Sequence, residues 1–165
     1  VYFKERFAIP ESLEEIKSTW MDMARDKYTN KVPLKPGARE FLVWLRQQGI
    51  RTGIASSNGI ELVETVLKAQ GIQEYLESVH TCCEVPKGKP APDIYLLVAE
   101  TLGVKPEECL VFEDVPMGIL AGKNAGMRVC AVEDTFSASQ REEKKELADY
   151  YIESYDEIPR ERMQP

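Results

Sequence analysis

The stretch CLVFED, Cys109 to Asp114, is followed by VPMGILAGKNAG and then by MRVCAV, Met127 to Val132, and this order decides the fold. The two apolar runs have the length of buried strands, and the segment at about 117–125 between them has the length of a helix. Consecutive strands joined by a helix run parallel, because a parallel pair needs a long crossover connection. The stretch therefore predicts a strand–helix–strand unit of a parallel sheet.

The same alternation extends in both directions along the chain. We expect further strands at 51–56, 78–82 and 150–152. Further helices are expected at 37–48, between Gly59 and Gly71, from Asp93 (as the helix cap) to Leu102, and at 138–148. Strands alternating with helices of this length predict an α/β fold with a three-layer, doubly wound parallel sheet.

The first 31 residues differ from this pattern. Ser12 and Glu15 have the spacing of a helix capping box, and apolar residues then recur at helical period as far as Asn30. The segment KVPLKPG, with two prolines and a glycine, is typical of a linker. We therefore expect a small helical subdomain at 1–31 and the α/β core at 32–165.

Composition excludes several classes of partner. The 165 residues carry a net charge of −7, which argues against nucleic acid or an anionic membrane surface as the main partner. No apolar run approaches the ~20 residues that span a bilayer. The four cysteines lack the spacing of metal ligands, so we expect free thiols and a cytoplasmic location. A monomer is the default expectation.

Polar residues follow three of the predicted strands. In doubly wound sheets, ligands bind beyond the carboxyl ends of the strands. Those ends carry Ser56-Ser57-Asn58, then Lys87-Gly88-Lys89, then Glu113-Asp114. Hydroxyls, a lysine and two carboxylates should therefore converge on one crevice, a set that suits a phosphate and a divalent metal.

Each of these three motifs also has a plainer interpretation. The N–H groups after Ser56 would favour an anion at a helix N-terminus, but Ser-Ser-Asn-Gly is also an ordinary capped turn. Lys89 lies in a loop stiffened by prolines, although most loop lysines are simply solvated. Glu113 and Asp114 offer the oxygen ligands that Mg²⁺ prefers, yet Asp114 could merely cap the next helix.

Three longer segments together resemble the haloacid dehalogenase superfamily, in its β-phosphoglucomutase-like branch of phosphatases and mutases. They are PLKPGAREFLVWLRQQGIRTGIASSN, GKPAPDIYLLVAETLG and VFEDVPMGILAGKNAGM, in that order. The resemblance runs from about Val32 to Ile158, and it implies that residues 1–31 are the C-terminal part of a helical cap.

The resemblance also implies roles for single residues. Ser56 and the Ser57 N–H would bind the transferring phosphoryl group, with Asn58 in the same loop. Lys89 would neutralise the charge of that group, so that Ser56 and Lys89 are the catalytic candidates. Asp114 would be a Mg²⁺ ligand, with Glu113 in or just beyond the metal's coordination shell.

One departure from the family is large. Its members begin with a strand ending in Asp-x-Asp, which supplies the nucleophile and the general acid/base, and this sequence contains no Asp-x-Asp. We expect the missing segment to be present as a separate fragment or as a further part of the same chain. It would lie between the strands ending at Ser56 and Asp114.

The resulting hypothesis is a Mg²⁺-dependent phosphohydrolase that acts on a small phosphorylated metabolite through an aspartyl-phosphate intermediate. A sugar-phosphate mutase is the alternative enzyme, and a non-catalytic module that binds phosphometabolites is the alternative from another class. The paired carboxylates favour an enzyme. Trp20 or Lys17 could reach a substrate, but Trp20 lies on the apolar stripe and is expected to pack.

Overall fold

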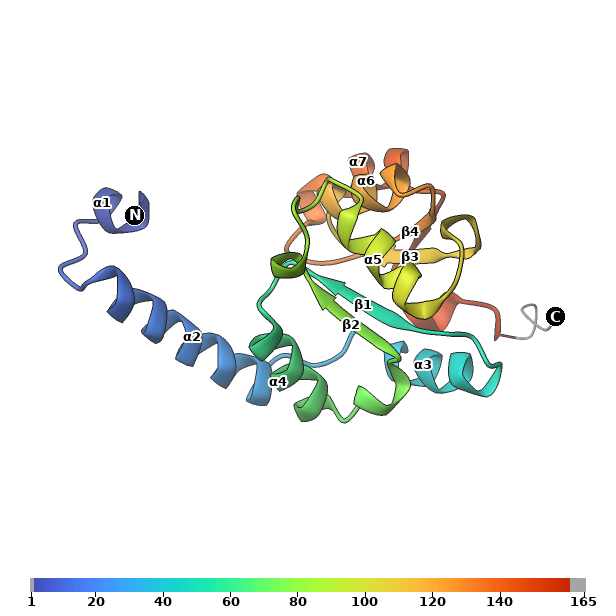
Figure 1. Cartoon of the computed structure of the whole chain (residues 1–165), viewed down its shortest axis with the longest axis horizontal. Coiled ribbons are helices and arrows are strands. Elements are labelled where there is room, and N and C mark those ends of the chain that lie inside the picture. The colour runs from blue at the N-terminus through green and yellow to red at the C-terminus, as the bar shows by residue number, and fades with distance from the viewer. Residues whose placement is uncertain (1, 161–165) are drawn as a thin grey trace.

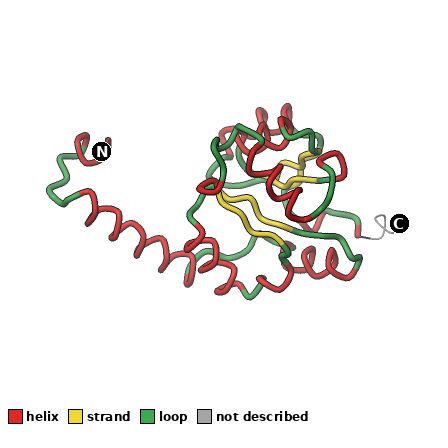
Figure 2. Tube along the Cα trace, viewed as in Figure 1, coloured by secondary structure: helices red, strands yellow, loops and turns green. Residues whose placement is uncertain are grey.

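The computed structural model describes residues 2–160 and contains five short strands, all of them parallel to their neighbours (Figures 1 and 2). One sheet pairs β1 (Gly53–Ser56) with β2 (Ser78–Thr81). The other has the order β3-β4-β5 and consists of Leu110–Glu113, Arg128–Val132 and Tyr150–Ile152. Each predicted strand is present, and four of the five are shorter than predicted.

Seven α-helices accompany the strands in the described part of the chain. The core helices are α3 (Ala38–Gln47), α4 (Ile60–Gln70), α5 (Asp93–Leu102), α6 (Pro116–Asn124) and α7 (Arg141–Leu147). Asp93 does not cap α5 as predicted: it is the first residue of the helix, and Pro92 precedes it without a side-chain cap. The helix predicted at 138–148 is shorter, because Ala138–Gln140 forms a 3₁₀ turn before α7.

Alternate residues of the strands face opposite helical layers, as expected for a doubly wound sheet. Ala55, Val111 and Val129 pack in one cluster with α5 and α6. Ile54 packs on the other face with α4, while Phe112 and Cys130 pack on that face near Tyr155. Phe41 of α3 meets Phe112 edge to face, with their ring centroids 5.4 Å apart. The three-layer α/β fold predicted from the sequence is confirmed.

The N-terminal helices α1 (Tyr2–Arg6) and α2 (Leu13–Asn30) project from this body, and only the end of α2 reaches α4 (Figure 1). The capping box is present, with Glu15 N–H donating to Ser12 Oγ over 3.2 Å and Ser12 N–H donating to Glu15 Oε2 over 2.8 Å. The apolar stripe of α2 is largely uncovered within residues 2–160. Trp20 is 56% exposed, so the prediction that it packs is wrong for this part of the chain.

The sheet is divided between β1 and β3. Among residues 2–160 these two strands share no ladder, and each is hydrogen-bonded to a neighbouring strand on one side only. About half of the backbone groups of such a strand point away from its one partner. A buried group left unpaired costs ~1–3 kcal/mol, so the gap is a place where a further strand would stabilise the fold.

We therefore predict that a further parallel strand joins β1 to β3 in the full-length protein. Amide hydrogen exchange measured by NMR should show slow exchange throughout Gly53–Ser56 and Leu110–Glu113, because both edges of each strand would then be paired. Fast exchange at alternate amides of these strands, with slow exchange at the others, would contradict the prediction.

The structure also bears on membrane-spanning helices and on the state of the cysteines. No helix in the described residues is long and apolar enough to cross a membrane. The four cysteines are free thiols, and Cys130 is buried in the core as a small apolar residue.

Candidate functional site

The loop that joins β1 to α4 begins with Ser56. Its Oγ accepts a hydrogen bond from the Asn58 N–H over 3.1 Å, which folds the loop back toward the strand end. The Ser57 Oγ lies 3.7 Å from Cys82 Sγ, and Asn58 Nδ2 donates to the Tyr28 hydroxyl over 3.3 Å. α4 starts two residues after Asn58, so the loop leads directly into a helix N-terminus, as the sequence predicted.

Lys89 connects the ends of β1 and β3, although it lies in neither strand. Its Nζ donates to the Ala55 carbonyl over 3.2 Å and forms an ion pair with Glu113 Oε1. The ammonium also lies 4.8 Å from the centroid of the Tyr95 ring. Two of its three N–H donors thus have acceptors within the described residues, and the third is available to another acceptor. The structure therefore brings Lys89 beside the residue that precedes Ser56.

Glu113 is held by more than Lys89. Its carboxylate also accepts a hydrogen bond from the Tyr95 hydroxyl, and the side chain is only 10% exposed. Gly118 of α6 makes this position possible, because a Cβ on Gly118 would lie 2.2 Å from Glu113 Cδ. Gly118 thus leaves room for the Glu113 carboxylate, in addition to allowing close helix packing.

Asp114 follows β3 and faces the loop after β4. Its Oδ2 lies 3.8 Å from Lys35 Nζ, and Lys35 is also paired with Asp134 and donates to the Glu133 carbonyl over 3.1 Å. Burial, and then the neighbouring charge of Glu113, raise the pKa of the Asp114 carboxyl, and Lys35 opposes this shift. A carboxylate whose ionised form is disfavoured by its surroundings gains from a nearby cation.

The donor atoms at this edge fit a hard divalent cation. No group of three or more His, Cys, Asp or Glu side chains converges anywhere in residues 2–160. Mg²⁺, however, commonly takes one or two protein carboxylates and completes its shell with phosphate and water. Asp114 fits that pattern directly, whereas Glu113 is engaged by Lys89 and Tyr95.

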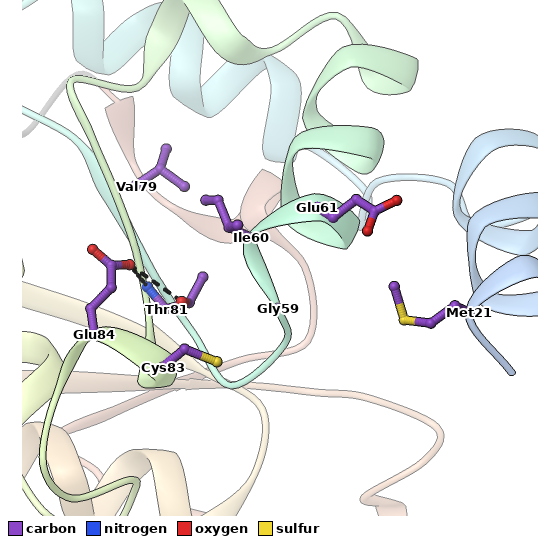
Figure 3. Close-up of a pocket in the computed structure, with 8 residues that line it drawn as sticks. All are labelled: Met21, Gly59, Ile60, Glu61, Val79, Thr81, Cys83 and Glu84. Atoms are coloured by element: carbon purple, nitrogen blue, oxygen red, sulfur yellow. Dashed lines mark hydrogen bonds between the residues drawn. The ribbon is translucent and has the colours of Figure 1, made fainter. Parts of the chain in front are cut away.

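A pocket of about 580 Å³ opens beside the β1–α4 loop (Figure 3). It lies between α2 on one side and the start of α4 and the end of β2 on the other. Its lining combines Met21 of α2 with Gly59, Ile60, Glu61, Val79, Thr81, Cys83 and Glu84. The pocket places part of the N-terminal region next to the predicted anion loop.

Four residues of this region were not predicted from the sequence. They are Lys35, Tyr95, Ser137 and Lys144, and their contacts at the strand ends join residues 12 to 98 positions apart in the chain. A pattern of neighbouring residues carries no signal for such contacts. Lys35 does lie in the linker segment that was singled out for its prolines.

The chain matches a known protein family. Residues 3–126 match the sequence profile of the haloacid dehalogenase-like hydrolases. The chain belongs to that family. Hexitol phosphatase B of Escherichia coli is 32% identical over 126 residues, which are 76% of this chain and 56% of that protein. The phosphorylated carbohydrates phosphatase of Thermotoga maritima is 32% identical over 123 residues, covering 74% and 57%.

Among solved structures, CbbY of Rhodobacter sphaeroides in complex with xylulose-1,5-bisphosphate superimposes with a TM-score of 0.80. The match is 25% identical and covers 90% of this chain and 67% of that one. The chain spans just over half the length of these two phosphatases. The profile match and these homologues confirm the family predicted from the sequence.

The Gly118–Glu113 contact leads to a prediction. In the full-length protein, Gly118→Ala should push the Glu113 carboxylate off Lys89 and Tyr95, because no Cβ fits at 2.2 Å. We expect a loss of phosphatase activity of roughly tenfold or more, by analogy with other residues that orient a functional group.

Gly122→Ala is the matched control for that substitution. Its Cβ would lie 2.7 Å from Val129 Cγ2, so it disturbs apolar packing one turn further along the same helix. Assays of kcat and melting temperature should show destabilisation in both variants, but a specific loss of kcat only for Gly118→Ala. Equal effects on kcat would contradict the role given to Gly118.

Proposed function

We propose that the full-length protein is a Mg²⁺-dependent phosphatase of small phosphorylated metabolites. The observation that carries the proposal is the position of Lys89, whose ammonium joins the end of β1 to the carboxylate at the end of β3. A cation held between an anion loop and paired carboxylates suits a phosphoryl group beside a divalent metal.

The residues at the strand ends then have distinct tasks. Ser56 and the Ser57 N–H bind the phosphoryl oxygens, with Asn58 holding the loop against Tyr28. Lys89 neutralises charge on the phosphoryl group. Asp114 holds Mg²⁺, with Glu113 beside it, and the metal supplies further neutralisation of the phosphoryl oxygens when it is bound.

The attacking group comes from outside the described residues in this proposal. Phosphoryl transfer to the enzyme needs a carboxylate in line with the leaving group, and residues 2–160 contain no Asp-x-Asp. A strand in the gap between β1 and β3 would end beside Ser56, Lys89 and Asp114. Its first carboxylate would take the phosphoryl group as the substrate's ester O–P bond breaks, and its second Asp, as general acid, would protonate the departing alcohol oxygen. Water, deprotonated by the same group, would then attack the aspartyl phosphate and release inorganic phosphate. Residues 1–31 would form part of the cap that closes over the substrate, and residues 32–165 the core.

The names of the homologues indicate only a broad class of substrate. The matched phosphatases are named for hexitol phosphates and phosphorylated carbohydrates, and the matched CbbY structure holds a sugar bisphosphate. We therefore propose a sugar or sugar-alcohol phosphate. The bound bisphosphate also keeps a sugar-phosphate mutase as the second candidate.

Phosphate release by the full-length protein tests the proposal. A panel of sugar phosphates and sugar-alcohol phosphates should yield inorganic phosphate with Mg²⁺ present, and EDTA should stop the release. Following the same reactions by ³¹P NMR separates the two candidates, because a mutase would give an isomeric sugar phosphate. A panel that gives neither product with Mg²⁺ would contradict the proposal.

A further inference from the structure

The side chain of Lys144 is completely buried, which is rare for a lysine. It lies on α7, in the run REEKKEL, whose other lysine is exposed at the surface. The Lys144 ammonium donates to Ser137 Oγ over 2.9 Å, to the Val132 carbonyl over 3.3 Å and to Glu133 Oε2 over 3.4 Å. The whole set of partners lies at the end of β4 and in the loop that follows it.

The hydrogen bonds of this cluster have only one possible direction. An ammonium group can donate but cannot accept, and a backbone carbonyl can accept but cannot donate. Ser137 Oγ lies between the two, because it also contacts the Asp114 carbonyl oxygen at 2.5 Å. Lys144 must therefore donate to Ser137, and the Ser137 hydroxyl must donate to Asp114. The chain of donors ends on the backbone of the proposed metal ligand.

The Glu133 carboxylate balances the buried charge. Hydrogen bonds from Arg141 and Tyr151, with the nearby Lys144 ammonium, hold the pKa of Glu133 down at about 2. The loop after β4 is also tied from the other side, where Lys35 bonds both Glu133 and Asp134 and lies 3.8 Å from Asp114 Oδ2. Ser137 thus holds the backbone of Asp114, and Lys35 lies opposite the Asp114 carboxylate.

We propose that Ser137 and Lys144 are positioning residues that fix Asp114 for cation binding. The inference rests on the proposed function, since it concerns the same Asp114. A buried ion pair is weak support for stability, because an apolar group of similar volume often replaces it without loss. The Lys144 ammonium fixes the direction in which the Ser137 hydroxyl donates. That hydroxyl in turn fixes the position of the Asp114 backbone. Partners of metal ligands act in this way in other metal sites.

Ser137→Ala in the full-length protein tests the inference. It removes the donor to Asp114 and leaves Lys144 its bonds to Val132 and Glu133. We expect Mn²⁺, used as a spectroscopic probe of the Mg²⁺ site, to bind roughly tenfold more weakly by electron paramagnetic resonance titration. The Mg²⁺ concentration for half-maximal phosphatase activity should rise by a similar factor, while kcat at saturating Mg²⁺ stays close to that of the wild type.

Thr52→Val is the matched control. The Thr52 hydroxyl is also partly buried and donates to a backbone carbonyl, that of Tyr75, but it precedes β1 and lies at the opposite edge of the sheet. This variant should lower the melting temperature and leave Mn²⁺ affinity unchanged. Lys144→Met is the second variant: it keeps the Ser137 hydroxyl but removes the group that orients it, and it should also weaken Mn²⁺ binding.

The outcomes distinguish failure of the positioning role from failure of the proposed function. Wild-type Mn²⁺ affinity in both Ser137→Ala and Lys144→Met, in a wild-type protein that does bind Mn²⁺, would overturn the positioning role alone. A wild-type protein that neither binds Mn²⁺ nor releases phosphate would overturn the proposed function and this inference with it. Weaker binding in Thr52→Val to the same degree would show a general loss of stability and would also overturn the positioning role.

Discussion

Asp114→Asn should nearly abolish phosphatase turnover in the full-length protein. The change replaces a charged oxygen ligand with a neutral one of the same shape. Loss of a residue that only supports a metal ligand typically costs 10–100-fold in affinity or activity, so loss of the ligand's own charge should exceed about 100-fold. Isothermal titration with Mg²⁺ and measurement of kcat at several Mg²⁺ concentrations would check both effects.

Asp149→Asn is the control for this substitution. Asp149 accepts hydrogen bonds from Lys123 over 2.6 Å and from the Val129 N–H over 2.7 Å, near the start of β4. It is therefore a well-held carboxylate at the opposite edge of the sheet from Asp114. The control should lose some stability and keep its Mg²⁺ affinity. Near-normal activity in Asp114→Asn would rule out the proposed metal site.

Helix caps and strands could be predicted because short sequence patterns indicate them. The capping box of Ser12 and Glu15 needs only four residues, and the structure has both of its hydrogen bonds. The strand ending at Glu113 is an apolar run followed by a turn, and it pairs with β4 from Leu110 opposite Arg128 to Glu113 opposite Ala131. The convergence of Lys89 and Glu113 followed from one general rule, that ligands bind where parallel strands end.

The remaining parts of the site depend on contacts that sequence patterns do not reveal. Lys144 and Lys145 are neighbours in a charged helix, and only the packing of α7 against the loop after β4 buries the first of them. Lys35 meets Asp134 across a separation of 99 residues. The exposure of Trp20 was mispredicted for a related reason: a helical apolar stripe shows that a partner is expected but not where it lies.

Lys89→Ala should lower the phosphatase rate by roughly 10²–10³, or ~3–4 kcal/mol, by analogy with removing one group that stabilises charge in a transition state. The structural reason is that Lys89 is the cation between the end of β1 and Glu113. Lys87→Ala is the control, because Lys87 belongs to the same loop but is exposed. Steady-state kinetics of both variants should show a normal kcat for Lys87→Ala.

Stability must be separated from catalysis in this experiment. Lys89 and Glu113 are only 12% and 10% exposed, so removing the lysine leaves a nearly buried carboxylate without its ion partner. Breaking such a pair can cost ~3–5 kcal/mol of stability, whereas removing both charges costs much less. The double variant Lys89→Met with Glu113→Gln should therefore regain thermal stability, because Tyr95 can still donate to the amide oxygen. It should remain inactive, since the charge that would face the phosphoryl group is gone. Recovery of activity together with stability would show that Lys89 acts only by neutralising Glu113 within the fold.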